Sequence, residues 1–390
     1  MPMALEGVKV IEMGTFGPAN LTACHLGDMG ADVVMVESPV NRNMPRGSAY
    51  AEGGHTRAIF SRNKKSIVLD LSKNEARDIL HKLAKGTDVF IEANRPGVAK
   101  RLGFDYQTLS AINPRIICAS LTGYGQTGPY KDLPGHGNVW EGIGGWLRTQ
   151  GQNWGNMGGD YTGRPYINWY HLADLKAVYT TFASILMALY QRDKIGTGQY
   201  LDLAIFDTVI TVRDQEVPHD GDGAFAAGDI AENVYQCKDG GWIATNAGEV
   251  IQWANFCKAL GVPELTKERG AQGQRAQEII ETFNRIFKTR TRDEWFEDLR
   301  KIDTEAVKCN TLDEVPQDPQ VKVRGMHVEV VGDGGHKQVQ YGIPFKLSKT
   351  PGRSYFHRAP KFGEHTGQIM AELGYKQEDI AQLTRAGAVI

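Results

Sequence analysis

The first 130 residues alternate between short apolar runs and segments with the spacing of amphipathic helices. Strands that alternate with helices of about ten to fifteen residues are typical of β-α units, whose parallel strands form one sheet covered on both faces. The apolar runs, and with them the predicted strands, are residues 8–13, 32–37, 66–71, 88–93 and 115–121, followed by a later run at 200–207. The pattern predicts an α/β domain built on a parallel sheet.

The loops that leave three of these strands contain closely spaced glycines. They lie at residues 14–18, 94–97 and 123–125. Ligands of open parallel sheets bind beyond the carboxyl ends of the strands. We therefore expect the three loops to share the rim of one pocket.

Two features suggest a dinucleotide site, but both fall short of its requirements. Residues 123–128 have the G-x-G-x-x-G spacing, yet residues 129–134 read as a loop, so no helix offers its N-terminus to a pyrophosphate. Glu37 lies where a ribose-binding acid would stand, but the glycines of 14–17 have the wrong spacing for close backbone approach. The sequence therefore disfavours a nicotinamide or flavin cofactor.

The longest apolar segment follows His171, and residues 177–191 carry no charged side chain. Apolar and small residues lie on every side of it, which predicts a helix that is buried all round. The segment is too short and too rich in Thr, Ser and Ala for a membrane span. Asp174 opens this helix. It is either the N-cap or a carboxylate that the helix dipole keeps ionised for chemistry.

Residues 135–170 hold four of the seven tryptophans, many glycines and few charged residues. A long loop of this kind either lines a functional site or places its aromatic rings in the core. His136 lies at its start. By itself, a lone histidine is either a structural residue or an acid–base group.

The β-α rhythm ends at about residue 207. Residues 208–230 read as a linker, and residues 231–330 predict a smaller α+β domain that contains a hairpin at 234–246. Its helical patterns lie at 250–260, 272–288 and 292–301. Residues 331–390 read as a return segment with a second hairpin near 332–335 and two helices.

Composition narrows the class of protein. The 390 residues suffice for two or three domains, and a net charge of −2 argues against nucleic acid or a membrane surface as the main partner. The five cysteines are scattered without metal-ligand spacing, which favours reduced thiols and no metal site. The N-terminal residues lack the pattern of a signal peptide, so we expect a cytoplasmic protein.

Several stretches together resemble the class III CoA-transferases, the CaiB/BaiF group, which is homologous to the α-methylacyl-CoA racemases. They are LEGVKVIEMGTFGPAN, LGDMGADVVMVE, RNKKSIVLDL, DVFIEANRPGVAKRLGFDYQTLSAINPRIICASLTGYGQTGPY, LADLKAVYTTFASILMALYQRDKIGTGQYLDLAIFD and APKFGEHTGQIMAELGY. The resemblance implies a Rossmann-like large domain formed by residues 1–207 and 331–390, with the small domain inserted between them. It also implies an interlocked homodimer.

The resemblance further implies a reaction. The family's catalytic aspartate opens a helix about twenty residues before a K-x-G-x-G-Q segment, which makes it Asp174 here. In the family this carboxylate attacks an acyl-CoA thioester, and an aspartyl anhydride and an aspartyl-CoA thioester follow before an acceptor acid takes the CoA. The substrates are then an acyl-CoA and a carboxylic acid. No metal and no tightly bound cofactor are expected.

Positions matching the family's CoA-binding residues are spread over three segments: Thr15, Phe16, Leu69, Ser72, Asn94, Arg95, Arg101 and Leu102. Arg95 and Arg101 have the guanidinium geometry suited to the ADP phosphates. Lys64 and Lys65 are weaker candidates.

Two departures from the transferase pattern keep other functions open. No run of glycines is present, and His136 stands where the racemases carry a base. A racemase or other CoA-ester isomerase would use His136 with Asp174 and Glu249. Gly137, in place of an Asp after the histidine, and the GEHT segment favour a transferase instead. A third alternative is a non-catalytic subunit of a heteromeric transferase.

Overall fold

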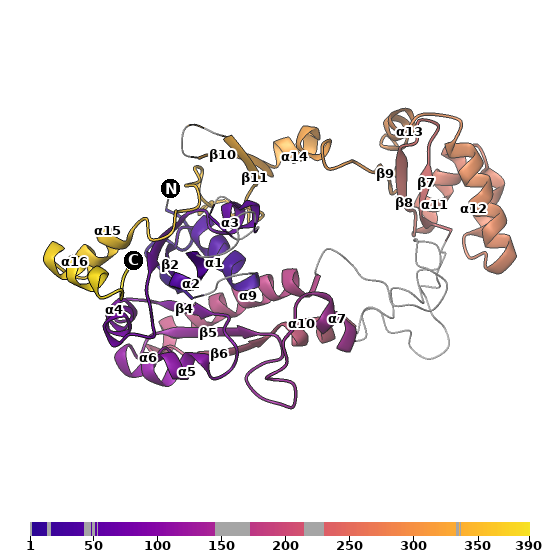
Figure 1. Ribbon diagram of the computed structural model, residues 1–390. Coiled ribbons are helices and arrows are strands. Elements are labelled where there is room, and N and C mark those ends of the chain that lie inside the picture. The colour runs from indigo at the N-terminus through magenta and orange to yellow at the C-terminus, as the bar shows by residue number, and fades with distance from the viewer. Residues whose placement is uncertain are drawn as a thin grey trace. The chain divides into compact units, whose positions relative to one another are not determined.

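The computed structural model describes residues 2–13, 17–42, 48, 51–52, 54–144, 172–213, 230–332, 335 and 337–390. These residues form two compact units (Figure 1). The first unit combines the described parts of 1–144, 172–213 and 322–390, and the second contains 230–321. Segments from both halves of the chain therefore build the first unit.

The first unit is built on a six-stranded sheet whose strands are all parallel. The strands are β1 (Lys9–Glu12), β2 (Asp32–Glu37), β3 (Lys64–Val68), β4 (Val89–Glu92), β5 (Ile117–Thr122) and β6 (Tyr200–Ala204). Their order, β3-β2-β1-β4-β5-β6, is that of the Rossmann fold. The predicted parallel sheet is confirmed. The last strand is shorter than predicted, because α10 (Ile205–Arg213) begins directly after it and occupies the start of the predicted linker.

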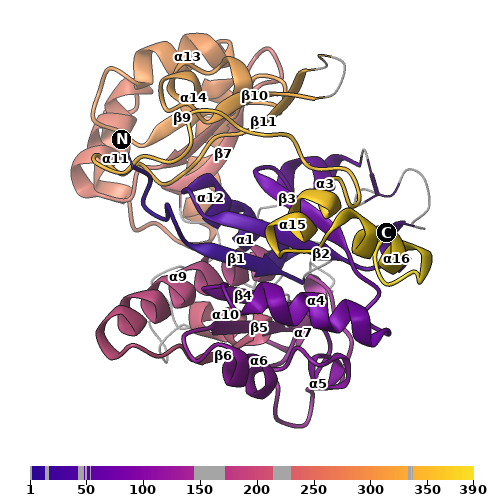
Figure 2. The same ribbon diagram turned by 90° about the vertical axis from the view of Figure 1, so that its left-hand side faces the viewer.

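Helices cover both faces of this sheet (Figure 2). On one face α4 (Asn74–Ala84), α6 (Tyr106–Ile112) and α15 (Thr366–Glu372) share a core with strand residues such as Ile11 and Phe90. Alternate strand residues point the other way, toward α1 (Pro18–Asp28) and α9 (Leu172–Ile195), which pack against each other. The remaining helices of this unit are α2 (Pro39–Arg42), α3 (His55–Phe60), α5 (Val98–Leu102), α7 (Asn138–Ile143) and α16 (Gln377–Arg385), and α14 (Pro319–Val323) spans the boundary between the units.

The prediction that the long apolar helix is buried on every side is wrong for one face of α9. Ala177, Ile185 and Ala188 are buried against the unit, but Met187 and Tyr190 are 64% and 66% exposed. The helix contacts α1, α7, α10, β5 and β6, yet these contacts leave the side chains of Met187 and Tyr190 largely exposed. Of the helices described, α9 is the one with the length and composition of a membrane span, yet its buried side is part of the core of this unit.

The second unit is a small α+β domain. Strands β7 (Glu232–Gln236), β8 (Trp242–Asn246) and β9 (Ala306–Lys308) form an antiparallel sheet, which confirms the predicted hairpin. Helices α11 (Val250–Ala259), α12 (Gly273–Phe287) and α13 (Arg292–Leu299) agree with the three predicted helices. An aromatic core formed by Tyr235, Trp253, Phe256, Phe283 and Phe287 holds them together.

The chain returns to the first unit at Lys322. The antiparallel strands β10 (His327–Val331) and β11 (Lys337–Tyr341) therefore belong to the first unit, although the sequence placed residues up to 330 in the small domain. The last residues run beside the end of β3, where Leu69 forms an antiparallel bridge with Val389.

Candidate active site

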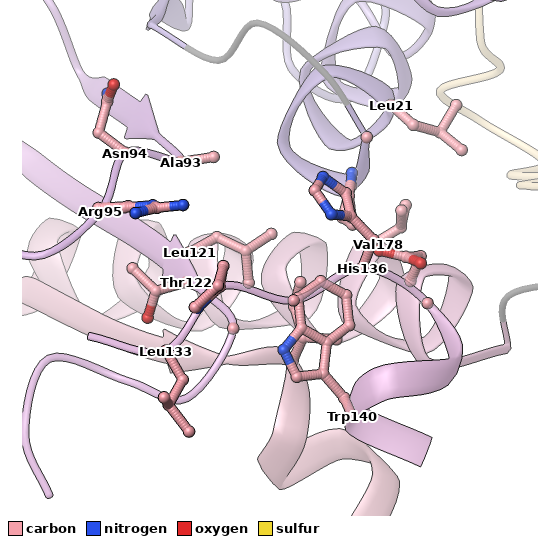
Figure 3. A pocket seen from close by; sticks show the side chains of 18 of the residues that line it. Leu21, Ala93, Asn94, Arg95, Leu121, Thr122, Leu133, His136, Trp140 and Val178 are labelled. Carbon is pink, nitrogen blue, oxygen red and sulfur yellow. The ribbon is translucent and has the colours of Figure 1, made fainter. Parts of the chain in front are cut away.

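A cavity of about 750 Å³ lies at the carboxyl ends of the strands in the first unit (Figure 3). Its lining includes the loops after β1, β4 and β5, the segment before α7 and the first turns of α9. The predicted sharing of one rim by three strand-end loops is confirmed for their described parts, which include Gly17, Asn94 and Gly123.

Asp174 and His136 line this cavity together, although 37 residues separate them in the sequence. Asp174 lies in the first turn of α9, two residues after Leu172, so it is not the N-cap. The positive end of the helix dipole favours the ionised form of a carboxylate at this position. His136 lies just before α7, and its ring centroid is 6.4 Å from that of Trp140.

Asn94 and Arg95 follow β4 on a loop that Glu92 holds. One oxygen of Glu92, Oε2, accepts hydrogen bonds from the backbone N–H and the side-chain amide of Asn94, at 2.8 and 3.2 Å. Burial raises the pKa of Glu92, and the hydrogen bonds from Ser120 and Asn94 oppose this shift. Arg95 points into the cavity (Figure 3), and no carboxylate among the described residues forms an ion pair with it.

Leu69, Ser72, Arg101 and Leu102 are not among the residues that line the cavity. Leu69 is only 1% exposed, and its backbone N–H donates to the carbonyl of Glu37 at 2.9 Å, so it offers almost no surface to a ligand. The Ser72 hydroxyl donates to Asp70 at 2.6 Å, and Ser72 lies two residues before α4 begins. Arg101 and Leu102 lie on α5, where Arg101 is exposed.

Three predicted residues lie outside the cavity or outside the described residues. Thr15 and Phe16 are not among the described residues. Glu249 belongs to the second unit and occupies the N-cap position of α11, where its backbone N–H donates to Gln252 at 3.4 Å.

Trp140 is a cavity residue whose importance the sequence did not indicate. Its side chain lies against two glycines from different segments, Gly123 after β5 and Gly135 before His136. A Cβ atom on either glycine would lie 2.6 Å from the indole nitrogen, closer than van der Waals contact permits. These positions therefore require glycine for close approach, and Trp140 fixes the distance between the strand end and the His136 segment.

Glu141 is a second residue that the sequence analysis did not select. It is only 1% exposed, and its Oε1 accepts a hydrogen bond from the backbone N–H of Ala173 at 3.2 Å. Ala173 directly precedes Asp174. The signal in the sequence was an acidic residue in a segment with few charges, but nothing local identified its partner.

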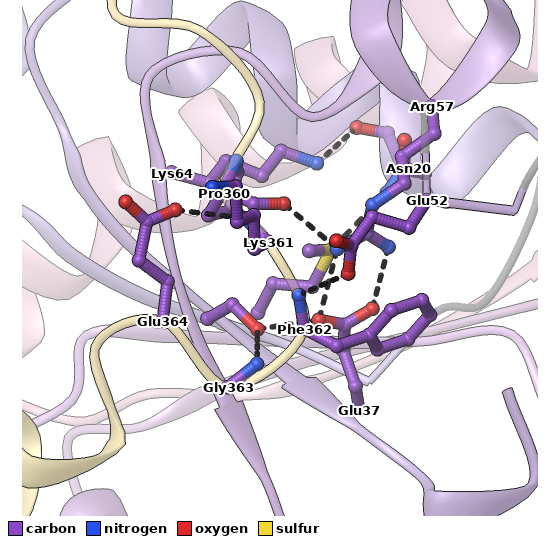
Figure 4. Close-up of polar contacts among 12 residues, drawn as sticks. Asn20, Glu37, Glu52, Arg57, Lys64, Pro360, Lys361, Phe362, Gly363 and Glu364 are labelled. Atoms are coloured by element: carbon purple, nitrogen blue, oxygen red, sulfur yellow. Dashed lines mark hydrogen bonds and ion pairs between the residues drawn. The ribbon is translucent and has the colours of Figure 1, made fainter. Parts of the chain in front are cut away.

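Glu37, which lies where a ribose-binding acid would stand, instead binds other side chains of the same unit. Arg57 donates to both oxygens of Glu37, at 2.6 and 3.1 Å, and the hydroxyl of Ser66 also bonds to this carboxylate (Figure 4). Burial raises the pKa of Glu37, and the contact with Arg57 opposes the shift. Lys64 is likewise committed, because its Nζ lies 2.7 Å from Glu12 and both side chains are fully buried. These contacts disfavour a ribose at Glu37 and a CoA phosphate at Lys64.

Comparison with known proteins agrees with this architecture. The family model of CoA-transferase family III matches residues 5–366. The chain is 32% identical, over 98% of its length, to the succinyl-CoA–L-malate CoA-transferase beta subunit of Chloroflexus aurantiacus, and the match covers 97% of that protein. It is 30% identical to the succinate–glutarate CoA-transferase of Agrobacterium fabrum, over 95% of both chains.

A solved structure shows the same fold. A CaiB/BaiF family protein from Brucella suis superimposes with a TM-score of 0.79 and 28% identity, covering 96% of this chain and 100% of that chain. Together with the family match, which the resemblance of the sequence stretches predicted, this leads to one conclusion. The chain belongs to CoA-transferase family III.

Proposed function

We propose that the protein moves CoA from an acyl-CoA thioester to a free carboxylic acid, with Asp174 as the nucleophile. The observation that carries this proposal is the position of Asp174, in the first turn of α9 and on the wall of the large cavity. The helix N-terminus favours the ionised carboxylate, which is the form that attacks.

The proposed reaction has two halves of the same kind. A carboxylate oxygen of Asp174 attacks the thioester carbonyl, the CoA thiolate leaves, and a mixed anhydride forms. The thiolate then attacks the Asp174 carbonyl, which releases the donor acid and leaves an aspartyl-CoA thioester. The acceptor carboxylate reverses these steps and leaves as its own CoA thioester. No oxidant or reductant is needed, because each step exchanges one acyl bond for another.

CoA itself is proposed to run from Asp174 toward the edge of the sheet at β3. Asn94 and Arg95 would contact it within the cavity, and Ser72, with Arg101 and Leu102 on α5, would contact its outer part. Thr15 and Phe16 complete the proposed set.

The acceptor is proposed to be a dicarboxylic acid. Two relatives are named for reactions of succinyl-CoA with L-malate and of succinate with glutarate. In this chain Arg95 and Lys131 line the same cavity as Asp174, so a cation is available for a second carboxylate. Activity with succinate should exceed activity with butyrate, which has the same length. Arg95→Met should reduce this preference, and an unchanged preference would assign Arg95 to CoA alone.

The test of the mechanism is to trap the intermediate. The protein is incubated with succinyl-CoA and then with hydroxylamine, and the peptide that contains Asp174 is examined by mass spectrometry. We expect a hydroxamate at Asp174 and none in Asp174→Ala. Activity of Asp174→Ala equal to that of the wild type, with no adduct in the wild type, would show the proposal to be wrong.

A CoA-ester isomerase is a second candidate, because His136 shares the cavity with Asp174. The racemase alternative also assigns Glu249 an acid–base role. It predicts that the α-proton of a 2-methylacyl-CoA exchanges with deuterium oxide when no acceptor acid is present. Absence of exchange, or exchange that His136→Ala leaves undiminished, would remove this candidate.

The assembly is proposed to be a cytoplasmic homodimer, with the subunits interlocked through the segments that join the two units. The exposed apolar face of α9 supports an interface, since Leu175, Tyr179, Met187 and Tyr190 are each at least 42% exposed. Light scattering of the purified chain should give a dimer. A monomer that gains activity only with a different subunit would favour a heteromeric transferase, a possibility that the name of the beta-subunit relative raises.

A further inference from the structure

We infer that Glu141 is a positioning residue for Asp174, holding the first turn of α9 in the orientation that the nucleophile needs. This inference rests on the proposed role of Asp174. It concerns a contact between α7 and α9, two helices that meet at the wall of the cavity.

The first turn of a helix has backbone N–H groups without intrahelical partners. In α9, the N–H of Ala173 donates to Glu141 Oε1 at 3.2 Å. Both residues are 1% exposed, so water does not compete for this hydrogen bond. A carboxylate at this position also interacts favourably with the positive end of the helix dipole.

The carbonyl of Ala173 is held as well, and it belongs to the peptide bond that leads into Asp174. It lies 3.5 Å from the hydroxyl of Thr208, which also donates to the carbonyl of Ile205 at 2.6 Å. Thr208 lies on α10, which packs closely on the end of α7: a Cβ on Gly144 would be 2.6 Å from Val209. Glu141 therefore binds the N–H of Ala173, and Thr208 lies next to its carbonyl.

Stability alone does not account for a carboxylate here. Burial of a charged group is unfavourable, and the second oxygen of Glu141, Oε2, has no hydrogen-bond partner among the described residues. An apolar side chain of similar volume would pack at this place without that penalty. What an apolar side chain cannot supply is the acceptor for the Ala173 N–H, and this contact sets the orientation of the turn that carries Asp174.

The test compares Glu141→Leu, which removes the acceptor, with Glu141→Gln, which retains an oxygen in its place. We expect Glu141→Leu to lower kcat by about 10- to 100-fold, because small displacements of a reacting group have effects of this size. Its KM for succinyl-CoA should stay within about twofold of wild type. Its Tm should fall by no more than a few degrees, because removal of the buried charge offsets part of the cost of leaving the Ala173 N–H unpaired. Glu141→Gln should restore kcat to within about threefold of wild type.

Thr208→Val provides a weaker perturbation, at the next peptide unit of the same turn, and should lower kcat by about two- to fivefold. A wild-type kcat in Glu141→Leu, or an equal loss in Glu141→Gln, would overturn the inference. If Leu is not accommodated, Met, which is flexible and unbranched, gives the same test. Failure of both variants to fold would assign Glu141 a purely structural role. If Asp174→Ala is active, the proposed function itself fails, whatever Glu141 does.

Discussion

Two groups of buried polar side chains in the first unit differ in how completely they are paired. Beside β3, each buried carboxylate has a cation: Glu12 with Lys64 at 2.7 Å, Glu37 with Arg57 at 2.6 Å, and Asp28 with Arg62 at 2.6 Å. Glu141, next to the cavity-lining Trp140, is a buried carboxylate without a cation among the described residues, and its Oε2 has no hydrogen-bond partner there. Unpartnered buried atoms by themselves do not separate the groups, since Arg57 Nε in the first group is one, as are Thr122 Oγ1 and Trp140 Nε1 at the cavity. The first group holds the chain together, and the second surrounds the proposed nucleophile.

The presence or absence of a compensating cation indicates which buried polar groups stabilise the fold and which have a role at the proposed active site. A buried charge is tolerated when a partner compensates it, so pairing is the expected state of a structural group. A buried carboxylate without a cation, as at Glu141, requires another explanation, and the inferred positioning of Asp174 supplies it. Variants of the two groups should therefore separate activity from stability.

The largest effect is expected at the cavity. Asp174→Ala should lower turnover by about 10⁴-fold or more, because removal of a covalent nucleophile eliminates the reaction path. Its Tm should change by no more than a few degrees, since the side chain is only partly buried. Steady-state kinetics and thermal unfolding measure the two quantities. A large loss of Tm would place Asp174 among the structural groups.

The opposite result is expected for the paired group. Lys64→Met leaves the carboxylate of Glu12 buried without its cation, and removing one partner of a buried pair typically costs about 3–5 kcal/mol. Urea unfolding measures this loss. The kcat of the folded fraction should be close to wild type. The exposed pair of Lys337 and Glu329 is the matched control, and Lys337→Met should leave the urea midpoint nearly unchanged.

A smaller effect is expected at Gly135, where a substitution should change both stability and substrate binding. Gly135→Ala places a Cβ against the indole of Trp140 and should lower stability by about 1–3 kcal/mol, with a rise in KM as the His136 segment moves. Adding Trp140→Leu should recover part of the stability, because the smaller side chain gives space to the new methyl group. Equal, additive losses in a double-mutant cycle would contradict the close contact between these residues.

The smallest effect concerns pH. Burial raises the pKa of Glu92 above its usual 4.5, so the folded protein binds this proton more tightly than the unfolded chain does. The contribution of Glu92 to stability therefore falls as the pH rises from about 4.5 through the raised pKa. Glu92→Gln should show a flatter dependence of Tm on pH than the wild type. The reverse slope would mean that Asn94 and Ser120 outweigh burial.

The periodicity of the sequence was sufficient for much of the fold. Alternating apolar runs and helical segments predicted the strands and their parallel arrangement, because periodicity reports directly which side of a local element faces the core. The topology of parallel sheets then placed the strand-end loops on one rim. The long apolar helix located Asp174, and family resemblance supplied its proposed role.

Contacts between distant segments were decided only by the tertiary structure. Nothing in the local pattern around Glu37 pointed to Arg57 as its partner, or around Trp140 to Gly123 and Gly135. Local patterns also could not predict the hydrogen bond between Glu141 and Ala173, because the two residues are 32 positions apart.

The exposed face of α9 gives the physical reason. An apolar composition records that a surface avoids water, but it does not say whether the same chain or another one covers it. The sequence by itself therefore determined the elements, the parallel sheet and the place of Asp174. The tertiary structure decided which charges are paired, which polar atoms remain at the cavity, and which side of α9 stays open.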